Sequence, residues 1–325
     1  MASTCDVVAA SETASGAVAL AGRWTYNVPA PSSARAARHE SDRSAASAAD
    51  GEVRRCTVPA ATVIERIRRH VDESPYYARL LGESWLDELL ADDRMRRLFG
   101  RSKSRKEITE AYAAAEQVRR MLRALGGDSE RGRGAVVFDV CSGRGVGALL
   151  LSFLLPEARV VMVDVDGAMD LTHVQARPNL AFCELDLFSE GAPAVLRAAG
   201  GDASVRVATA MHLCGALSPR LITLACRLDL LDAFVCCPCC LKGSLGTEVK
   251  AASRRQSRDP HAVLLDTLLA LCQREATDGD DVGLFIDAHM CSPKNGFVGV
   301  VKRRGAAPPA ESCEPCEDEP GGGAA

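Results

Sequence analysis

A glycine-rich turn is the stretch of this sequence best suited to hold a cofactor. It reads Asp139-Val-Cys-Ser142-Gly143-Arg-Gly145-Val-Gly147 and follows an apolar run. Glycine has no Cβ and tolerates positive φ, so such a turn lets the backbone approach a nucleoside closely. The spacing differs from the Gly-x-Gly-x-x-Gly of a pyrophosphate site, and a carboxylate at position 139 would accept a hydrogen bond from the ammonium group of a methionine moiety. The alternative is a tight turn that binds no ligand.

Acidic side chains also end the next two apolar runs. Asp164 lies 25 residues after Asp139, where an acid typically accepts hydrogen bonds from ribose hydroxyls, and Asp166 is the second choice for this role. Asp186 could reach the exocyclic amine of adenine, with Leu187 and Phe188 lining the base. Each acid alone could be a surface or helix-capping residue. Three in order predict a nucleoside site, because ligands of open α/β sheets bind at the carboxyl ends of the strands.

The fourth apolar run ends at Met211-His212-Leu-Cys214-Gly. If this run is the fourth strand of the same sheet, its end faces the bound cofactor. We therefore expect His212 to act as a general base or to orient the substrate. The alternative is a structural histidine bonded to backbone.

The chain has 14 Cys, and four of them lie in Cys236-Cys237-Pro238-Cys239-Cys240. Adjacent thiols are poorly placed to join distant segments, so we expect a reducing compartment and no disulfide framework. A zinc site is disfavoured because successive cysteines on a strand face opposite sides and no outside Cys-x-x-Cys pair is well placed. A catalytic thiolate pairing Cys214 with this cluster, a redox pair of Cys236 with Cys239, and apolar packing remain. Packing is the preferred interpretation, with no metal.

The elements that position these residues alternate between short apolar runs and helical patterns. Expected strands are 135–140, 159–164, 180–186, 205–211, 232–237, 282–287 and 296–302, and expected helices are 146–155, 168–176, 191–199, 218–229 and 259–276. Strands that alternate with helices predict a parallel, doubly wound α/β sheet. The last two runs lack a helix between them and predict an antiparallel hairpin. Five βα units closed by a hairpin are typical of a Rossmann-like class I methyltransferase with seven strands.

The 325 residues divide into four expected segments. Residues 1–57 and 305–325 have low-complexity composition and are expected to be disordered, 58–130 to form three helices, and 131–304 to form the cofactor-binding domain. Between the second and third helices, Arg94–Lys106 has seven basic residues in thirteen. As a flexible loop it could grip phosphates; the alternative is a solvated helix end and linker.

Composition gives little information on location. The net charge of -4 does not indicate a protein that binds polyanions over its whole surface. No apolar run is long enough to span a bilayer, so no membrane contact is expected. We expect the cytoplasm, or a plastid or mitochondrion if residues 1–57 are a transit peptide.

Four motifs together resemble a known family. Asp139-Val-Cys-Ser-Gly-Arg-Gly, Met211-His-Leu-Cys-Gly215, Cys237-Pro-Cys-Cys240 and Ser292-Pro-Lys-Asn295 are similar to the methyltransferase domain shared by the glutathione S-transferase C-terminal domain-containing protein, methyltransferase-like proteins and the tRNA acceptor-stem ribose 2′-O-methyltransferase. The resemblance covers roughly residues 105–303. It implies an S-adenosylmethionine-dependent methyltransferase with RNA as the leading substrate, and a tRNA ribose 2′-hydroxyl as one candidate acceptor. The amino-terminal zinc fingers of the tRNA enzyme have no counterpart here.

On this basis we expect substrate contacts from one further set of residues. They are Cys214, Cys237, Pro238, Lys294 and Asn295, while Ser142 and Gly147 join the donor site. One alternative is a cytosine-C5 RNA methyltransferase with Cys214 or Cys237 as the nucleophile. Another is a non-catalytic binding module that acts through the basic segment 94–106.

Overall fold

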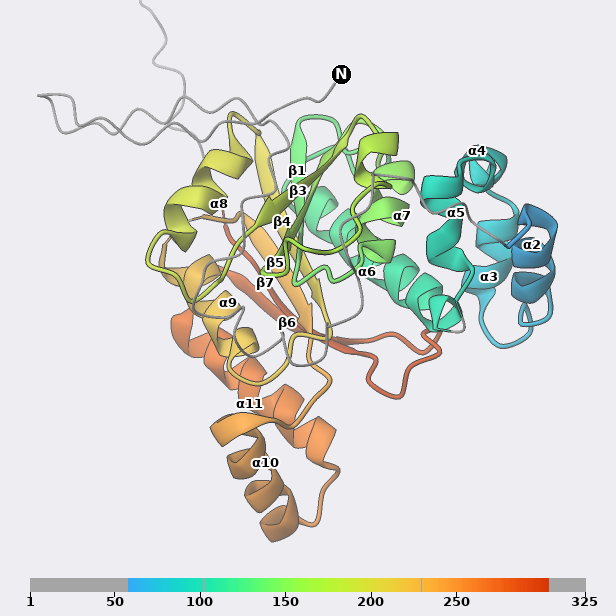
Figure 1. Ribbon diagram of the computed structural model, residues 1–325. Coiled ribbons are helices and arrows are strands. Elements are labelled where there is room, and N and C mark those ends of the chain that lie inside the picture. Colours follow the sequence, from blue (N-terminus) through green and yellow to red (C-terminus); the bar gives the residue numbers. More distant parts are fainter. Residues whose placement is uncertain (1–57, 102, 229, 304–325) are drawn as a thin grey trace, which may run out of the picture.

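The computed structural model describes residues 58–101, 103–228 and 230–303 (Figure 1). The expectations for residues 1–57 and 305–325 lie outside the described residues. None of the helices in the described ranges has both the length and the apolarity needed to cross a bilayer.

Within these ranges seven strands form one sheet in the order β3-β2-β1-β4-β5-β7-β6. Their bounds are β1 Ala135–Val140, β2 Arg159–Asp164, β3 Leu180–Glu184, β4 Val205–Met211, β5 Ala233–Cys237, β6 Asp281–Ile286 and β7 Gly296–Val301. The first five strands pair in parallel, and β7 is antiparallel to both β5 and β6. The class I methyltransferase arrangement predicted from the sequence is therefore confirmed. Its connections reverse direction between β1 and β4, and ligands of open α/β sheets bind at the carboxyl ends of the strands beside such a point.

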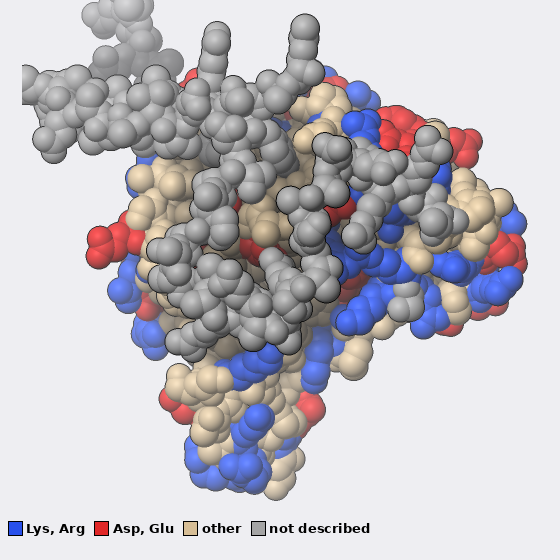
Figure 2. Space-filling model, in the orientation of Figure 1, with Lys and Arg blue, Asp and Glu red and all other residues tan. Residues whose placement is uncertain are grey.

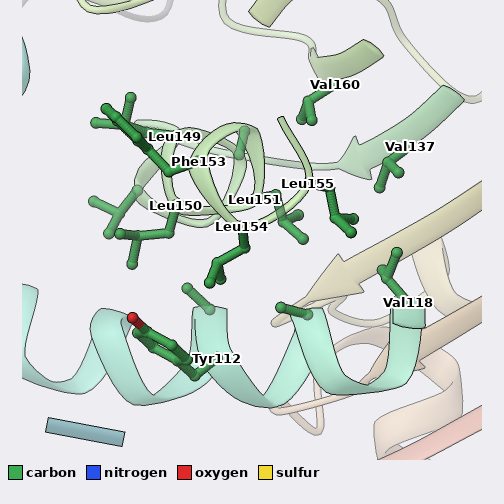
Figure 3. Packing of buried hydrophobic residues seen from close by; sticks show 14 of the residues in the cluster. Tyr112, Val118, Val137, Leu149, Leu150, Leu151, Phe153, Leu154, Leu155 and Val160 are labelled. Carbon is green, nitrogen blue, oxygen red and sulfur yellow. The ribbon is translucent and has the colours of Figure 1, made fainter. Parts of the chain in front are cut away.

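Helices cover both faces of the sheet. The helices of this part are α6 Ser104–Ala124, α7 Val146–Leu154, α8 Ala192–Gly200, α9 Leu217–Arg227, α10 Gly243–Gln256 and α11 Pro260–Glu275. Helices α6 and α7 share one buried apolar cluster with Val137 and Val160, whereas α8, α9 and α11 share another with Val136 and Phe138. Alternate residues of β1 thus enter opposite layers, as the period of a strand requires. Figure 3 shows Leu150 and Leu154 of α7 facing α6, with Leu151 on the side of the strands.

Two helices differ from the sequence expectation. The predicted helix 168–176 is wrong: only the short 3-10 helix η2, Val174–Ala176, forms there. The side chains of Asp166 and Asp170 accept hydrogen bonds from the backbone N–H groups of Ala168 and Thr172, and such local bonds compete with helix formation. Helix α10 was missed because few of its residues are apolar, and Val249 is the only large side chain that it buries.

The helical segment before the sheet also differs from the expectation of three helices. In the described part of the chain, four short helices precede α6: α2 Ala60–Arg68, α3 Pro75–Leu81, α4 Leu86–Ala91 and α5 Asp93–Phe99. Side-chain caps by Ser74 and Asp92 begin α3 and α5, so the periodic pattern breaks more often than apolar spacing alone indicates. The expectation of a flexible loop over 94–106 is also wrong. Its first six residues belong to α5 and its last three to α6.

The segment between β6 and β7 ties these helices to the sheet. The hydroxyl of Tyr76 donates to Oδ2 of Asp287 at 2.6 Å, and Oγ of Ser74 donates to the carbonyl of His289 at 2.6 Å. The backbone N–H of Cys291 donates to Oγ1 of Thr109 in α6 at 3.1 Å. Because β6 runs parallel to β5, this segment lies at the same edge as the carboxyl ends of β1 to β5. The helical segment is thereby held beside that edge.

Candidate functional site

The glycine-rich turn joins β1 to α7 and leaves an open space at one position. Gly143 has φ 51° and Gly145 has φ 78°, both in the left-handed region that favours glycine. A Cβ at Gly145 would collide with Met162 and His173, so this glycine is needed for packing. A Cβ at Gly143 would meet no atom within 4 Å. The turn therefore offers bare backbone and free volume at Gly143.

Polar groups around this space are positioned by the end of β2. Oδ2 of Asp164 accepts a hydrogen bond from the backbone N–H of Gly143 at 2.9 Å, which fixes the turn against β2. Asp166 is exposed, and its Oδ1 accepts from the N–H of Ala168 at 3.2 Å. The Oγ of Ser142 is buried and has no hydrogen-bond partner among the described residues. A buried hydroxyl without a partner is costly unless a ligand supplies one, so Ser142 fits a role in binding.

Asp139 lies behind the turn and is only 4% exposed. The pKa of its carboxyl is raised to about 7. Burial is the main cause, a hydrogen bond from the backbone N–H of Ala148 opposes it, and the negative charge of Asp164 adds to it. Near neutral pH the carboxyl therefore exchanges between its acid and its carboxylate form. A cationic ammonium group nearby would favour the carboxylate.

Asp139 gives the folded protein a distinct pH dependence. The pKa is about 7 in the folded chain and ordinarily 3.8, so the folded state binds the proton more tightly. The stabilisation that this tighter proton binding gives the folded state is fully present below about pH 4 and is lost as the pH rises through about 7. We expect the free energy of unfolding in urea to fall by up to roughly 1.4 kcal/mol per pH unit in this window. Asp139→Asn should reduce the dependence of the free energy of unfolding on pH, and the control Asp166→Asn should not change it. An unchanged pH dependence in Asp139→Asn would contradict the assignment of this proton to Asp139.

The edge next to β3 offers an apolar surface for a base. Asp186 is exposed, and its Oδ1 accepts the backbone N–H of Phe188 at 2.9 Å. The side chain of Leu187 is 3% exposed and packs into the core, so it lines no open surface here. Phe188 and Val165 are 53% and 46% exposed, which is unusual for large apolar side chains. The apolar side chain exposed at this edge is therefore the aromatic ring of Phe188, and Leu187 is not exposed.

His212 follows β4 and takes part in a cluster of charged groups. Its φ of 57° is uncommon for a residue with a Cβ. Its Nε2 lies 2.7 Å from Oε1 of Glu110 and 3.0 Å from Nζ of Lys106, and Lys106 pairs with Glu110 at 2.9 Å. Sequence reasoning missed Glu110. The available signal was its position directly before the apolar run 111–115 of α6, where a carboxylate needs a partner.

Three cysteines meet at the ends of β4 and β5. The Sγ atom of Cys214 lies 3.0 Å from that of Cys239, which lies 3.2 Å from that of Cys240. The proposed redox partner of Cys239 is wrong: Cys236 is fully buried in the layer of α8, α9 and α11. Strand β5 ends at Cys237, so the alternation argument against a metal site does not apply to the two cysteines beyond it. Hydrogen bonding from Cys239 lowers the pKa of the Cys214 thiol and raises that of Cys239.

Of the other expected substrate contacts, Cys237 and Pro238 are buried, whereas Lys294 and Asn295 are half-buried. Cys237 is fully buried in the layer of α6 and α7, and its Sγ donates to the carbonyl of Lys294 at 3.2 Å. Pro238 is buried too, and its carbonyl lies 3.0 Å from Nε2 of His261. The Nδ2 of Asn295 donates to the carbonyl of Asp287 at 2.8 Å and closes the hairpin. These contacts give the residues packing and turn-forming roles, because the carboxyl end of β5 is covered by the hairpin.

Comparisons with known proteins give one family. A family model described as a methyltransferase domain matches residues 104–244, from α6 to the first residues of α10. No curated protein matches the sequence significantly. Similar solved structures include the methyltransferase SibL in its apo form, at 16% identity over 76% of this chain and 70% of that one with a TM-score of 0.41. An O-methyltransferase family protein from Burkholderia thailandensis is 14% identical over 75% of this chain and 73% of that one, with a TM-score of 0.37. The fibrillarin/Nop5p complex is 11% identical over 53% and 74%, with a TM-score of 0.36. Residues 104–244, less than half of this chain, are therefore similar to a methyltransferase domain.

Proposed function

We propose that this domain transfers the methyl group of S-adenosylmethionine to RNA. The observation that carries the donor assignment is the turn after β1, where an unpartnered buried Ser142 hydroxyl lies beside the open space at Gly143. The acids at positions 139, 164 and 186 lie at or just beyond the carboxyl ends of three adjacent strands. Asp139 accepts a hydrogen bond from the ammonium group of the donor. Asp164 accepts hydrogen bonds from the ribose hydroxyls, and Asp166 is the second choice for this role. Phe188 stacks on the base near Asp186.

The remaining residues of the site act on the methyl acceptor. The donor supplies an already electrophilic methyl group, so the domain must align the acceptor in line, exclude water and remove a proton. His212, at the end of β4, takes that proton. Glu110 and Lys106 contact its Nε2 and hold the ring in place.

Charge around α5 and α6 supports an RNA acceptor. Arg94, Arg96 and Arg97 form ion pairs with aspartates, so part of the positive charge of the basic segment is already paired within the protein. A pocket at the end of this segment is lined by Arg66, Arg101 and Arg105 together with apolar side chains such as Ile67 and Ile108. Figure 2 shows Lys and Arg gathered where the helical segment meets the sheet. Lys106 joins this basic surface to His212, so a phosphate bound there would lie near the site of transfer.

The cysteine-dependent alternative keeps one of its two candidate nucleophiles, Cys214. Burial raises the pKa of the Cys237 thiol to about 12, and a thiol in this state is a poor nucleophile. Only Cys214 of the two candidates is accessible. A ribose 2′-hydroxyl, which needs a base and no covalent intermediate, agrees better with the cluster at His212.

We also propose the broader organisation expected from the sequence. Residues 58–130 form a helical segment that contacts the acceptor, and 131–304 form the domain that binds the donor. The protein works in the cytoplasm, or in an organelle if residues 1–57 act as a transit segment.

The substrate is tested by comparing modified nucleosides. RNA from cells with and without the gene is digested and analysed by mass spectrometry, and the purified chain is then incubated with the unmodified RNA and donor. We expect one nucleoside, methylated on the ribose, to disappear from the deficient cells and to be restored in vitro. Unchanged RNA nucleosides together with normal donor binding would refute RNA as the acceptor. Loss of a base-methylated cytosine would favour the cysteine-dependent alternative.

A further inference from the structure

We propose that Cys214, Cys239 and Cys240 form a binding site for a thiophilic divalent cation of the zinc class. Their three Sγ atoms all lie within 4.8 Å of one another. They come from two different loops, one after β4 and one after β5. This inference does not depend on the identity of the methyl acceptor.

The loops that hold these cysteines are already in contact. A Cβ at Gly215 would lie 3.4 Å from the carbonyl oxygen of Lys242, so the two backbones approach closely just beyond the cysteines. Gly215 has φ 58°, which lets the first loop turn toward the second. The backbone therefore brings the thiols together before any ion is bound, which lowers the entropic cost of assembling the site.

The distances suit thiolate coordination after a small expansion. Zinc–sulfur bonds of about 2.3 Å in a tetrahedron separate neighbouring sulfurs by roughly 3.8 Å. The present separations of 3.0 and 3.2 Å are shorter by less than an ångström. All three cysteines are only half-buried, so an ion can enter from solvent. As the ion binds, the three thiols release three protons, and water takes the fourth position.

Three soft thiolates select zinc-class ions over magnesium or calcium, which prefer oxygen ligands. His212 is not the fourth ligand in this structure, because its Nε2 contacts Glu110 and Lys106 instead. The ion would clamp the loops after β4 and β5, which flank His212. Its role is then to fix the acceptor side of the site.

The experiment uses the reduced full-length chain and Co²⁺ as a spectroscopic probe, followed by displacement with Zn²⁺. We expect one equivalent of Co²⁺ to give thiolate charge-transfer and tetrahedral ligand-field bands. Substituting Cys239→Ser should weaken Co²⁺ affinity by more than the roughly 10–100-fold typical of losing an outer-shell partner. Cys214→Ser and Cys240→Ser should behave alike.

Two control variants separate this site from other thiols. Cys291→Ser removes a half-buried cysteine that donates to the carbonyl of Glu73 instead. The double variant Cys313→Ser, Cys316→Ser removes the Cys-x-x-Cys pair near the carboxyl terminus. Both should keep the bands. The proposal is overturned if the wild type gives no bands, or if the variant with Cys214, Cys239 and Cys240 all replaced by Ser keeps them.

Discussion

Replacing Gly143 by Asp is expected to weaken binding of S-adenosylmethionine by at least roughly 100-fold, or ~3 kcal/mol. The new side chain would enter the space at Gly143, where no protein atom lies within 4 Å of a Cβ. It would place a carboxylate where the donor must approach the backbone. Because Asp tolerates left-handed backbone better than most residues, the fold should survive the change. Isothermal titration calorimetry measures the affinity.

Gly126→Asp is the matched control. Gly126 has φ 71° and also has no atom within 4 Å of a Cβ, so the backbone strain of the substitution is similar. It follows α6, next to Gly127, whose Cβ would lie 3.4 Å from Val205 at the start of β4, and so belongs to the opposite edge of the sheet. Both variants should lose similar stability in thermal unfolding. Equal donor affinity in the two variants would sink the donor-site assignment.

Replacing His212 by Asn is expected to lower kcat for methyl transfer by roughly 10²–10⁴-fold, the usual contribution of a positioned base. Donor affinity should stay unchanged, because His212 lies after β4 whereas the donor residues follow β1, β2 and β3. Asn is chosen because it tolerates the positive φ of this position and has no imidazole ring. Single-turnover transfer of labelled methyl to the RNA identified by nucleoside analysis gives the rate.

Two further variants sharpen this test. His289→Asn removes an exposed histidine from the segment between β6 and β7 and should leave kcat unchanged. Glu110→Gln keeps the size of the side chain that contacts His212 but removes its charge. We expect it to lower kcat with little change in KM, since it positions the base without contacting the donor site. A normal kcat for His212→Asn would remove His212 as the base.

The sequence by itself determined the order and kind of the central elements. Strands β1, β2 and β4 have the predicted bounds, because each is an apolar run long enough for one strand and is bounded by polar or glycine-rich turns. The turn after β1 could also be recognised, since a positive φ at Gly143 and Gly145 restricts the residue type locally. Local signals were less reliable where aspartate side chains compete for backbone N–H groups, as at the predicted helix 168–176.

Only the tertiary structure decided which side chains meet. Glu110 contacts a histidine 102 positions later in the chain, and Cys214 contacts Cys239 across two strand ends. Such contacts depend on the order of the strands in the sheet and on the residue at which each strand ends. The periodicity of apolar residues does not determine either of these with single-residue precision. Burial of Cys237 and partial exposure of Cys239 illustrate this, because β5 ends between them and the hairpin covers only the first. The sequence therefore located the edge of the sheet, and packing chose the residues that act there.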